Sequence, residues 1–394
     1  MKPAFDEGGK FSKLRSVFEG FETFLFVPHT TSQSGTHIHD SIDSKRTMFW
    51  VIIALVPAML FGMFNTGYQH YLATSAVMPG FWQIFFWGLL AVLPYIIVSY
   101  ATGLIIEFIA AQIKGEEIQE GFLVSGLLIP LIVPIGVPLW MVAVATAFAV
   151  IFAKEVFGGT GFNILNVALT TRVFLFFAYP TKMSGDQVWV SLRDYFSYGT
   201  AQPALDAFTG ATPLGQAAAT ADALQLTNAL GEPLTWWDAF LGLIPGCIGE
   251  TSTLFILLGG LFLLITGVAS WKIVVSTFAG GAIMATIFNI FGAEGSYLAM
   301  PFWWHWCLGG FAFGAFFMAT DPVTAARTEK GKWIYGLLVG MLAILLRVGN
   351  PAYPEGMMLS ILLMNIFAKF IDYLVVQRNI KMRAKRAAKV NASK

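Results

Sequence analysis

Long apolar stretches alternate with short polar connections along most of the chain. Ten of these stretches are candidate membrane spans, at residues 48–66, 82–112, 121–134, 138–153, 163–180, 252–268, 271–291, 301–319, 332–348 and 356–376. A helix needs about 20 apolar residues to cross the hydrocarbon core of a bilayer, so the pattern predicts an all-α polytopic membrane protein. The stretches 155–172 and 318–332 are Gly-rich or polar at membrane depth, which indicates irregular backbone that protein buries or that lines a cavity.

The charged residues give the predicted orientation of these spans. Only 12% of the 394 residues are charged and 56% are hydrophobic, whereas about 25% are charged in a typical soluble domain. Lys and Arg gather before the first span, after the last span and in alternate loops, which predicts that the segments 1–47 and 377–394 are both cytoplasmic. The loop 181–251 has two basic and seven acidic residues and is expected outside, on the periplasmic face of a bacterial inner membrane. The net charge of +1 gives no indication of a nucleic-acid partner.

The spans fall into two groups of five, at residues 48–180 and 252–376, on either side of the periplasmic loop. Each group has a Gly-rich apolar run followed by a Trp and one polar-interrupted stretch, although the sequence similarity is faint. Two halves of five spans each predict repeats that are inverted across the membrane. The polar segment 1–47 contains interleaved Phe residues, which is typical of an amphipathic segment lying on membrane lipid or on a partner subunit.

The periplasmic loop contains the motif that indicates chemistry. Asp206, Thr209, Gly210, Ala211 and Thr212 fit the pattern D-x-x-[ST]-G-A-T. From average residue frequencies, the five fixed positions occur by chance in roughly one chain of this length in a thousand. The pattern resembles the site at which a periplasmic flavin transferase joins FMN to a threonine through a phosphoester bond. That resemblance implies that the last threonine carries the FMN and that the other four residues are read by the transferase.

Several longer stretches extend the resemblance, among them KEVFGGTGFNILNVALTTRVFLFFAYP, IPGCIGETSTL, LGGFAFGAFFMATDPVTA and NPAYPEGMMLSIL. From about Asp40 to the carboxyl end, the chain resembles the NqrB family of membrane subunits of the Na⁺-translocating NADH:quinone oxidoreductase. The resemblance implies covalent FMN, a noncovalent riboflavin, ubiquinone as substrate and transport of Na⁺. It also implies a flavin transferase for maturation and, as partners, the five further subunits of the complex, called A, C, D, E and F.

The resemblance also implies roles for polar residues at membrane depth. Asn163 and Asn166 match the neighbourhood of riboflavin, although Val167 stands where the family more often has proline, which puts the local loop geometry in doubt. Gly103 and Glu107 border the quinone site. The structural alternative is helix packing at the glycine and hydrogen bonding of loop carbonyls by the two amides.

Three acidic residues, Glu107, Asp321 and Asp372, match places that are implicated in sodium uptake in this family. Carboxylates in membrane spans are costly and often functional, but interface anchoring or pairing with a nearby Lys or Arg is the alternative. For Asp372 the neighbouring Lys369 and Arg378 favour that alternative.

Other chemistry is not indicated by the sequence. Two cysteines without a CxxC spacing are too few for an iron–sulfur cluster or c-type haem, and we expect no metal site. His37 and His39 are interpreted as an interfacial segment, and His305 as part of an aromatic belt. Without a dinucleotide motif, no catalytic residue is assigned and NADH oxidation is expected on another subunit. Two alternatives stay open, namely the homologous RnfD subunit of an Rnf-type ferredoxin:NAD⁺ oxidoreductase and a redox-free channel or transporter.

Overall fold

The structure is a computed structural model that describes residues 18, 34–36, 44–74, 78–114, 121–184, 188–193, 210–220, 225–228, 230–350 and 355–392. These residues form helices and one isolated antiparallel bridge between Thr227 and Pro233, with no sheet in the described ranges. The longest helices are α2 (Ser44–Thr74), α3 (Phe81–Lys114), α11 (Trp271–Phe291), α14 (Glu329–Gly349) and α15 (Met357–Ala392). The all-α membrane architecture expected from the sequence is therefore confirmed.

The long helices are apolar on both their inward and outward faces. In α3 the buried positions include Trp87, Ala91 and Tyr95, which recur at helical spacing, while Leu90 and Ile97 on the other side are exposed. A helix that is hydrophobic all round is typical of a protein whose outer surface contacts lipid. Six helical segments in the described part of the chain are long and apolar enough to cross a membrane.

Shorter elements make up the remaining predicted spans. The apolar helices α4 (Phe122–Ile132), α6 (Val167–Ala178) and α10 (Thr253–Ile265) each have fewer residues than a full crossing needs. The predicted span 301–319 is broken into α12 (Phe302–Cys307), α13 (Phe311–Phe313) and the π-helical turn η6 (Gly314–Met318), with Gly309 and Gly310 in the left-handed region between them. The predicted number of ten complete spans thus stays a prediction.

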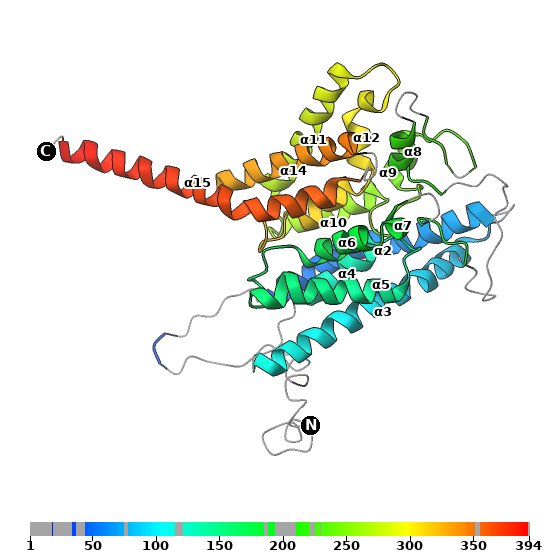
Figure 1. The fold of residues 1–394 in the computed structure, drawn as a ribbon, viewed down its shortest axis with the longest axis horizontal. Coiled ribbons are helices and arrows are strands. Elements are labelled where there is room, and N and C mark those ends of the chain that lie inside the picture. Colours follow the sequence, from blue (N-terminus) through cyan, green and yellow to red (C-terminus); the bar gives the residue numbers. More distant parts are fainter. Residues whose placement is uncertain are drawn as a thin grey trace, which may run out of the picture.

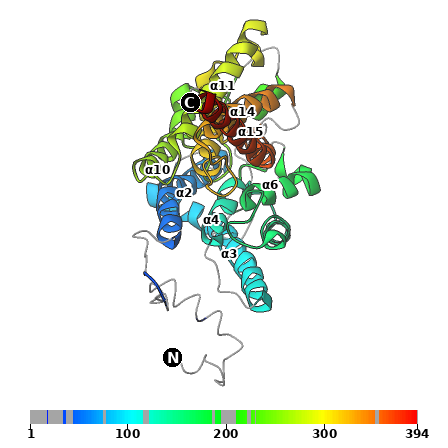
Figure 2. The ribbon, with the colours of Figure 1, turned by 90° about the vertical axis from the view of Figure 1, so that its left-hand side faces the viewer.

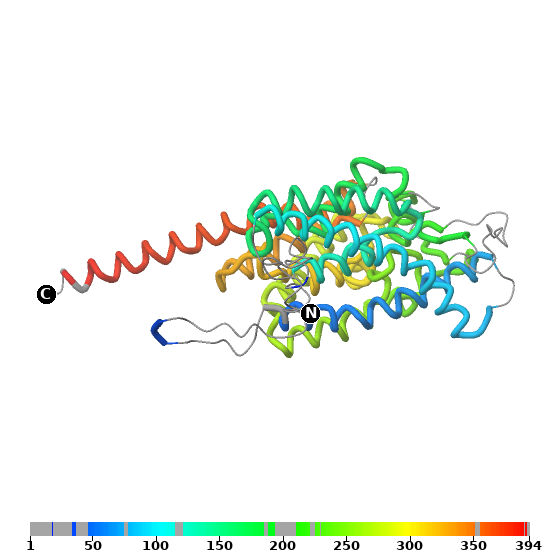
Figure 3. Tube along the Cα trace, turned by 90° about the horizontal axis from the view of Figure 1, so that it is seen from below, coloured from blue at the N-terminus to red at the C-terminus, as the bar shows by residue number. Residues whose placement is uncertain are grey.

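The helices form an elongated bundle in which α15 extends well beyond its neighbours at one end (Figures 1 and 3). In the first half, α3 packs on α4 and on α5 (Leu139–Ala149), and α5 packs on α6. In the second half, α11 packs on α12 and α14, and α14 packs on α15 (Figure 2). This parallel order of contacts supports the predicted repeat, but α10 packs mainly on α2 of the other half.

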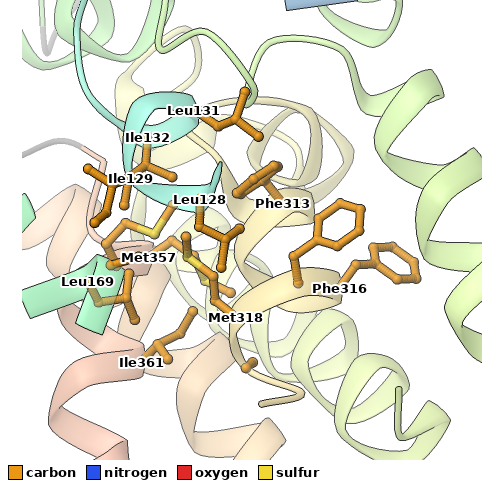
Figure 4. Packing of buried hydrophobic residues seen from close by; sticks show 14 of the residues in the cluster. Leu128, Ile129, Leu131, Ile132, Leu169, Phe313, Phe316, Met318, Met357 and Ile361 are labelled. Carbon is orange, nitrogen blue, oxygen red and sulfur yellow. The ribbon is translucent and has the colours of Figure 1, made fainter. Parts of the chain in front are cut away.

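The core lies where the short helices of the two halves meet. It contains residues of α4 and α6 from the first half and of α13, η6 and α15 from the second (Figure 4). The labelled members are Leu128, Ile129, Leu131, Ile132, Leu169, Phe313, Phe316, Met318, Met357 and Ile361. Burial of these side chains holds the irregular segments of both halves together, because each large apolar side chain contributes roughly 1.5–3 kcal/mol.

A second, smaller core lies at the end of the bundle opposite the exposed end of α15. Leu214 and Ala217 of α8 (Pro213–Ala219) pack with Ala239 of α9 (Trp236–Leu241) and with Met300 and Leu308 of the loops around α12. Figure 1 shows α8 and α9 at this end of the molecule. The small core fixes the position of the residue that begins α8.

Candidate functional site

Thr212 is the residue that begins α8. Its backbone is extended, its hydroxyl Oγ1 accepts a hydrogen bond from the backbone N–H of Gly215 at 3.1 Å, and Pro213 follows at the first helical position. A Thr N-cap followed by proline is a favoured helix start, because the hydroxyl satisfies an N–H that lacks a partner within the helix and proline needs no such partner. The Thr212 residue is 9% exposed, so its hydroxyl lies at the edge of the protein interior.

Helix α8 rests on the glycine pair that breaks the predicted span 301–319. Gly309 has φ +58°, and a Cβ atom there would lie 2.3 Å from Leu214 Cδ1 and 3.1 Å from Arg347 Nη2. Leu214 is 1% exposed. The absence of a side chain at Gly309 therefore lets Leu214 pack directly against this loop, and the loop positions Thr212.

A narrow pocket separates Thr212 from a buried polar network. Its walls include Thr212, Glu250, Glu355 and Gly310, and its volume of about 20 Å³ has room for about one water molecule. Glu250 is 5% and Glu355 7% exposed. The pocket is much too small for a flavin ring.

Arg172 of α6 holds the two carboxylates in place. The guanidinium is 1% exposed, forms an ion pair with Glu355, and places Nη1 3.1 Å from Glu250 Oε1 and 3.2 Å from Cys247 Sγ. Nη1 also donates to the carbonyl of Ile132 at the end of α4. A buried charge needs partners of this kind, and removing one partner of a buried pair costs about 3–5 kcal/mol.

Arg347 of α14 is the second buried guanidinium at this end. It donates to the carbonyls of His305 at 2.6 Å, Leu308 at 2.7 Å, Gly309 at 3.0 Å and Glu355 at 3.0 Å. These carbonyls belong to the broken segment and to the start of α15, so Arg347 satisfies backbone groups that intact helices would satisfy themselves. One arginine from each half of the chain thus supports the floor under Thr212.

This network was not predicted from the sequence, although each arginine stands in an otherwise apolar run, which is itself a signal of function or structure. Cys247, Glu250 and Glu355 place ligand atoms within 4.8 Å of one another, as in a metal site. The Arg172 guanidinium contacts all three, so it already supplies the positive charge that a metal ion would supply. The arrangement therefore gives no reason to change the expectation of no metal site.

Three residues expected at cofactor or ion sites come together at the other end of the bundle. Asn163, Asn166 and Asp321 line one cavity of about 100 Å³, and Asn166 Nδ2 donates to Asp321 Oδ2 at 3.3 Å. Asn166 also caps α6 through its side-chain oxygen, which accepts from the N–H of Leu169. The polar-interrupted stretches of the two halves therefore meet at this cavity.

Glu107 and Gly103 face inward from the same side of α3. Glu107 forms an ion pair with Lys154 in which both side chains are 5% exposed. A Cβ atom at Gly103 would lie 1.9 Å from the Phe122 ring, so the ring packs on the bare backbone of α3. Both arrangements agree with the structural interpretation of these residues, namely ion pairing and packing through a small residue.

The chain has relatives among families and proteins of known annotation. Residues 31–381 match the model of the NQR2, RnfD, RnfE family. A protein of Chromohalobacter salexigens, named as the B-type subunit of Na(+)-translocating NADH-quinone reductase, is 44% identical over 412 residues, which cover 98% of this chain and 95% of that protein. Proteins with the same name from Ectopseudomonas mendocina and Klebsiella pneumoniae are 45% and 44% identical and cover 97% and 98% of this chain, and 96% and 98% of their own lengths.

The chain belongs to the NQR2, RnfD, RnfE family. The resemblance stated from the sequence is thereby confirmed at the level of the family and its NqrB members. The match extends over both halves and the periplasmic loop, so the family relation covers the whole fold and the segment around Thr212 rather than a local motif alone.

Within this family framework, Asp372 has a structural place. Its carboxylate accepts hydrogen bonds from the backbone N–H groups of Arg327 at 2.8 Å and Thr328 at 2.9 Å, and from the Thr328 hydroxyl at 2.6 Å. Thr328 in turn caps α14. Asp372 therefore anchors the start of α14 to α15, away from the residues that line the cavity at Asp321.

The histidines and the first part of the flavin-acceptor motif complete the set of predicted residues. Asp206 and Thr209 lie outside the described residues, as do His37 and His39. His305 was interpreted as part of an aromatic belt, but it is 2% exposed and its backbone carbonyl is held by Arg347. This interpretation was wrong, because α12 turns its histidine into the protein interior rather than toward the membrane surface.

Proposed function

We propose that the chain is the membrane subunit of a Na⁺-translocating NADH:ubiquinone oxidoreductase and carries FMN as a phosphoester on Thr212. The observation that carries the proposal is the position of Thr212. The last threonine of the flavin-acceptor pattern is the N-cap of a helix docked on the outer end of the bundle, over buried groups from both halves. The names of the relatives at 43–45% identity support the same complex.

The distribution of charge supports the proposed sidedness. Lys114, Lys272 and Lys332 lie on the same side as the basic end of α15, while α8 and α9 lie at the opposite end (Figures 1 and 3). With positive residues inside, both termini are cytoplasmic and Thr212 faces the periplasm of a bacterial inner membrane. A flavin transferase acting in the periplasm can then reach the Thr212 segment.

The residues present fit a phosphoester at Thr212 with its ring outside the pocket. Attachment forms a bond between Thr212 Oγ1 and the phosphorus of the flavin donor, while the bond from that phosphorus to its leaving group breaks and the hydroxyl proton is lost. The oxygen stays on the N-cap and can still face the N–H of Gly215. Because the pocket holds about one water, the ring would lie against the outer surface of the protein or against a partner subunit. Bound flavin supplies one- and two-electron chemistry, and the chain supplies position.

Riboflavin and quinone fit less well to the described cavities. The cavity beside Asn163 and Asn166 measures about 100 Å³, below the roughly 300–1,000 Å³ of pockets that enclose larger ligands. The two asparagines would contact at most one edge of a flavin, and the Phe122 ring occupies the space against Gly103. No electron-transfer step is assigned to either molecule at these residues.

Sodium fits the polar end of the same cavity better. Na⁺ is a hard cation that prefers oxygen ligands, and the cavity wall offers the Asp321 carboxylate together with Thr320, Asn163 and Asn166. The remaining subunits supply NADH oxidation, since this chain has no dinucleotide motif. Its own residues thus hold the flavin segment at one end of the bundle and a cation-binding cavity toward the other.

The test is fluorescence of the denatured subunit in a gel. Subunit isolated from the native host should fluoresce, and Thr212→Ala should be dark. Thr220→Ala is the matched control, because Thr220 ends the same helix, is exposed and lies outside the pattern. A dark wild-type band, or a fluorescent Thr212→Ala band, would contradict the assignment of the flavin to Thr212.

The alternative within the family is the subunit of an Rnf-type complex, since the matching family model also covers RnfD and RnfE. Both alternatives predict flavin on Thr212. They differ in the electron acceptor: the purified complex should reduce ubiquinone with electrons from NADH if the proposed function is right. A complex that transfers electrons between ferredoxin and NAD⁺ and does not reduce quinone would support the Rnf-type alternative.

A further inference from the structure

Lys154 is a buried ammonium at a break in a membrane helix. It is the last residue of the π-helical turn η3 (Val150–Lys154) that follows α5, and its side chain is 5% exposed. π-helical turns inside helices occur frequently at functional sites, because the extra residue redirects the side chains that follow. Here the turn places the ammonium against the Glu107 carboxylate of α3.

The same lysine also lines the cavity that contains Asp321. The two buried carboxylates, Glu107 and Asp321, therefore lie around one ammonium. Lysine has a flexible four-carbon stem and a compact charge, so the ammonium can exchange between neighbouring carboxylates without backbone movement.

Asp321 differs from Glu107 in its partners. Its carboxylate accepts from Asn166 Nδ2 at 3.3 Å, from Thr324 Oγ1 at 3.0 Å and from the N–H of Val323 at 3.0 Å, which are all neutral donors. Lys369 approaches this loop but donates to the carbonyl of Val323 at 3.2 Å. In the described part of the chain, Glu107 thus has an ion-pair partner and Asp321 has none, although an ionised carboxylate away from water needs a compensating charge.

We propose that Lys154 is a tethered counter-cation that determines which of these two carboxylates binds Na⁺. With the ammonium on Glu107, the ion binds to Asp321 in the cavity. When the ammonium moves to Asp321, it displaces the ion. The inference rests on the proposed function, since it assumes that Na⁺ is the transported cation, but the sequence marks Lys154 only as a positive charge at the inner side of the membrane.

The experiment measures the NADH:quinone reductase activity of the assembled complex as a function of Na⁺ concentration. In Lys154→Met, Glu107 has no counter-ion and becomes a second carboxylate that attracts Na⁺. The half-saturating Na⁺ concentration should fall about fivefold or more, in the range typical of coupled sites. The maximal rate should fall as well, because no ammonium displaces the ion.

Three variants separate this role from a merely structural one. Lys154→Arg keeps the charge and should stay near the wild-type half-saturation. Lys114→Met removes the partner of Glu155, a more exposed ion pair of 2.8 Å on the same side, and should leave the half-saturation unchanged. The double variant Lys154→Met with Glu107→Gln removes both charges of the buried pair, so its half-saturation should return to the wild-type value while its maximal rate stays low.

Each outcome bears on the proposal. A wild-type half-saturation in Lys154→Met overturns it, and so does a double variant that keeps the shift. If Lys154→Met fails to assemble because it leaves a buried charge unpaired, the double variant decides, since a normal maximal rate there overturns the displacement by Lys154. A wild-type complex whose activity does not depend on Na⁺ would instead refute the proposed function.

Discussion

The docking of α8 on the glycine loop can be tested with Gly309→Ala. The new methyl group would lie 2.3 Å from Leu214 Cδ1, and it cannot move away from Leu214 because Arg347 Nη2 lies 3.1 Å from it on the loop side. Arg347 is itself fixed by carbonyls of the broken segment. We therefore expect Leu214 to leave its site and α8 to undock more often.

The magnitude follows from two separate costs. Alanine in the left-handed region costs about 1–2 kcal/mol, which weakens the loop itself. Loss of the buried Leu214 side chain costs roughly another 1.5–3 kcal/mol, which acts on α8. The second cost alone raises the opening equilibrium of α8 by about 10- to 100-fold, at about 1.4 kcal/mol for each factor of ten.

The assay is amide hydrogen exchange of the segment 210–220 in the purified complex, because exchange reports local opening directly. Gly295→Ala is the matched control: Gly295 also has positive φ, at +78°, but an added Cβ there meets nothing within 4 Å. The variant Gly309→Ala should exchange faster in this segment, retain flavin fluorescence and lose quinone reductase activity. In the double variant with Leu214→Ala, exchange should be no faster than in Leu214→Ala alone. Exchange in Gly309→Ala that matches Gly295→Ala would refute the docking of α8 through Leu214.

Three further predictions concern buried groups. Arg172→Met should lower the stability of the subunit by about 3–5 kcal/mol, measured as earlier thermal unfolding, because two carboxylates lose their partner, and adding Glu250→Gln should restore part of the loss. Asp321→Asn should raise the half-saturating Na⁺ concentration of quinone reduction, whereas Asp372→Asn should leave it unchanged, since Asp372 only anchors α14; equal shifts would contradict this division. Burial raises the pKa of the Cys247 thiol, so a maleimide should label this loop cysteine only after denaturation, and rapid labelling of the native complex would contradict its place beside Arg172.

The helices and the flavin-acceptor threonine could be predicted because both are local features of the sequence. Apolar runs of sufficient length predict helices wherever their own residues satisfy the backbone, and this succeeded for α2, α3, α11, α14 and α15. The segment 301–319 is equally apolar, but its helix is interrupted. The break depends on Arg347, which is 28 positions after the end of that segment and satisfies its carbonyls, and no local pattern indicates such a partner.

The composition of the sites was less predictable for the same reason. Asn163, Asn166 and Asp321 were each singled out, yet their common cavity joins positions 155 residues apart, and it arises only when the two polar-interrupted stretches meet. The sequence favoured anchoring for Asp372 through Lys369, but the observed donors are the backbone N–H groups at the start of α14. Charges near in sequence were thus a poor guide to charges near in space.

The central claim is that Thr212 carries a flavin at the outer end of this bundle. Intact mass of the subunit purified from its native host, followed by mass mapping of the peptide that contains Thr212, measures this directly. We expect the mass of the chain plus FMN less one water, with the added mass on Thr212 and absent in Thr212→Ala. An unmodified Thr212 peptide in an active complex would contradict the account.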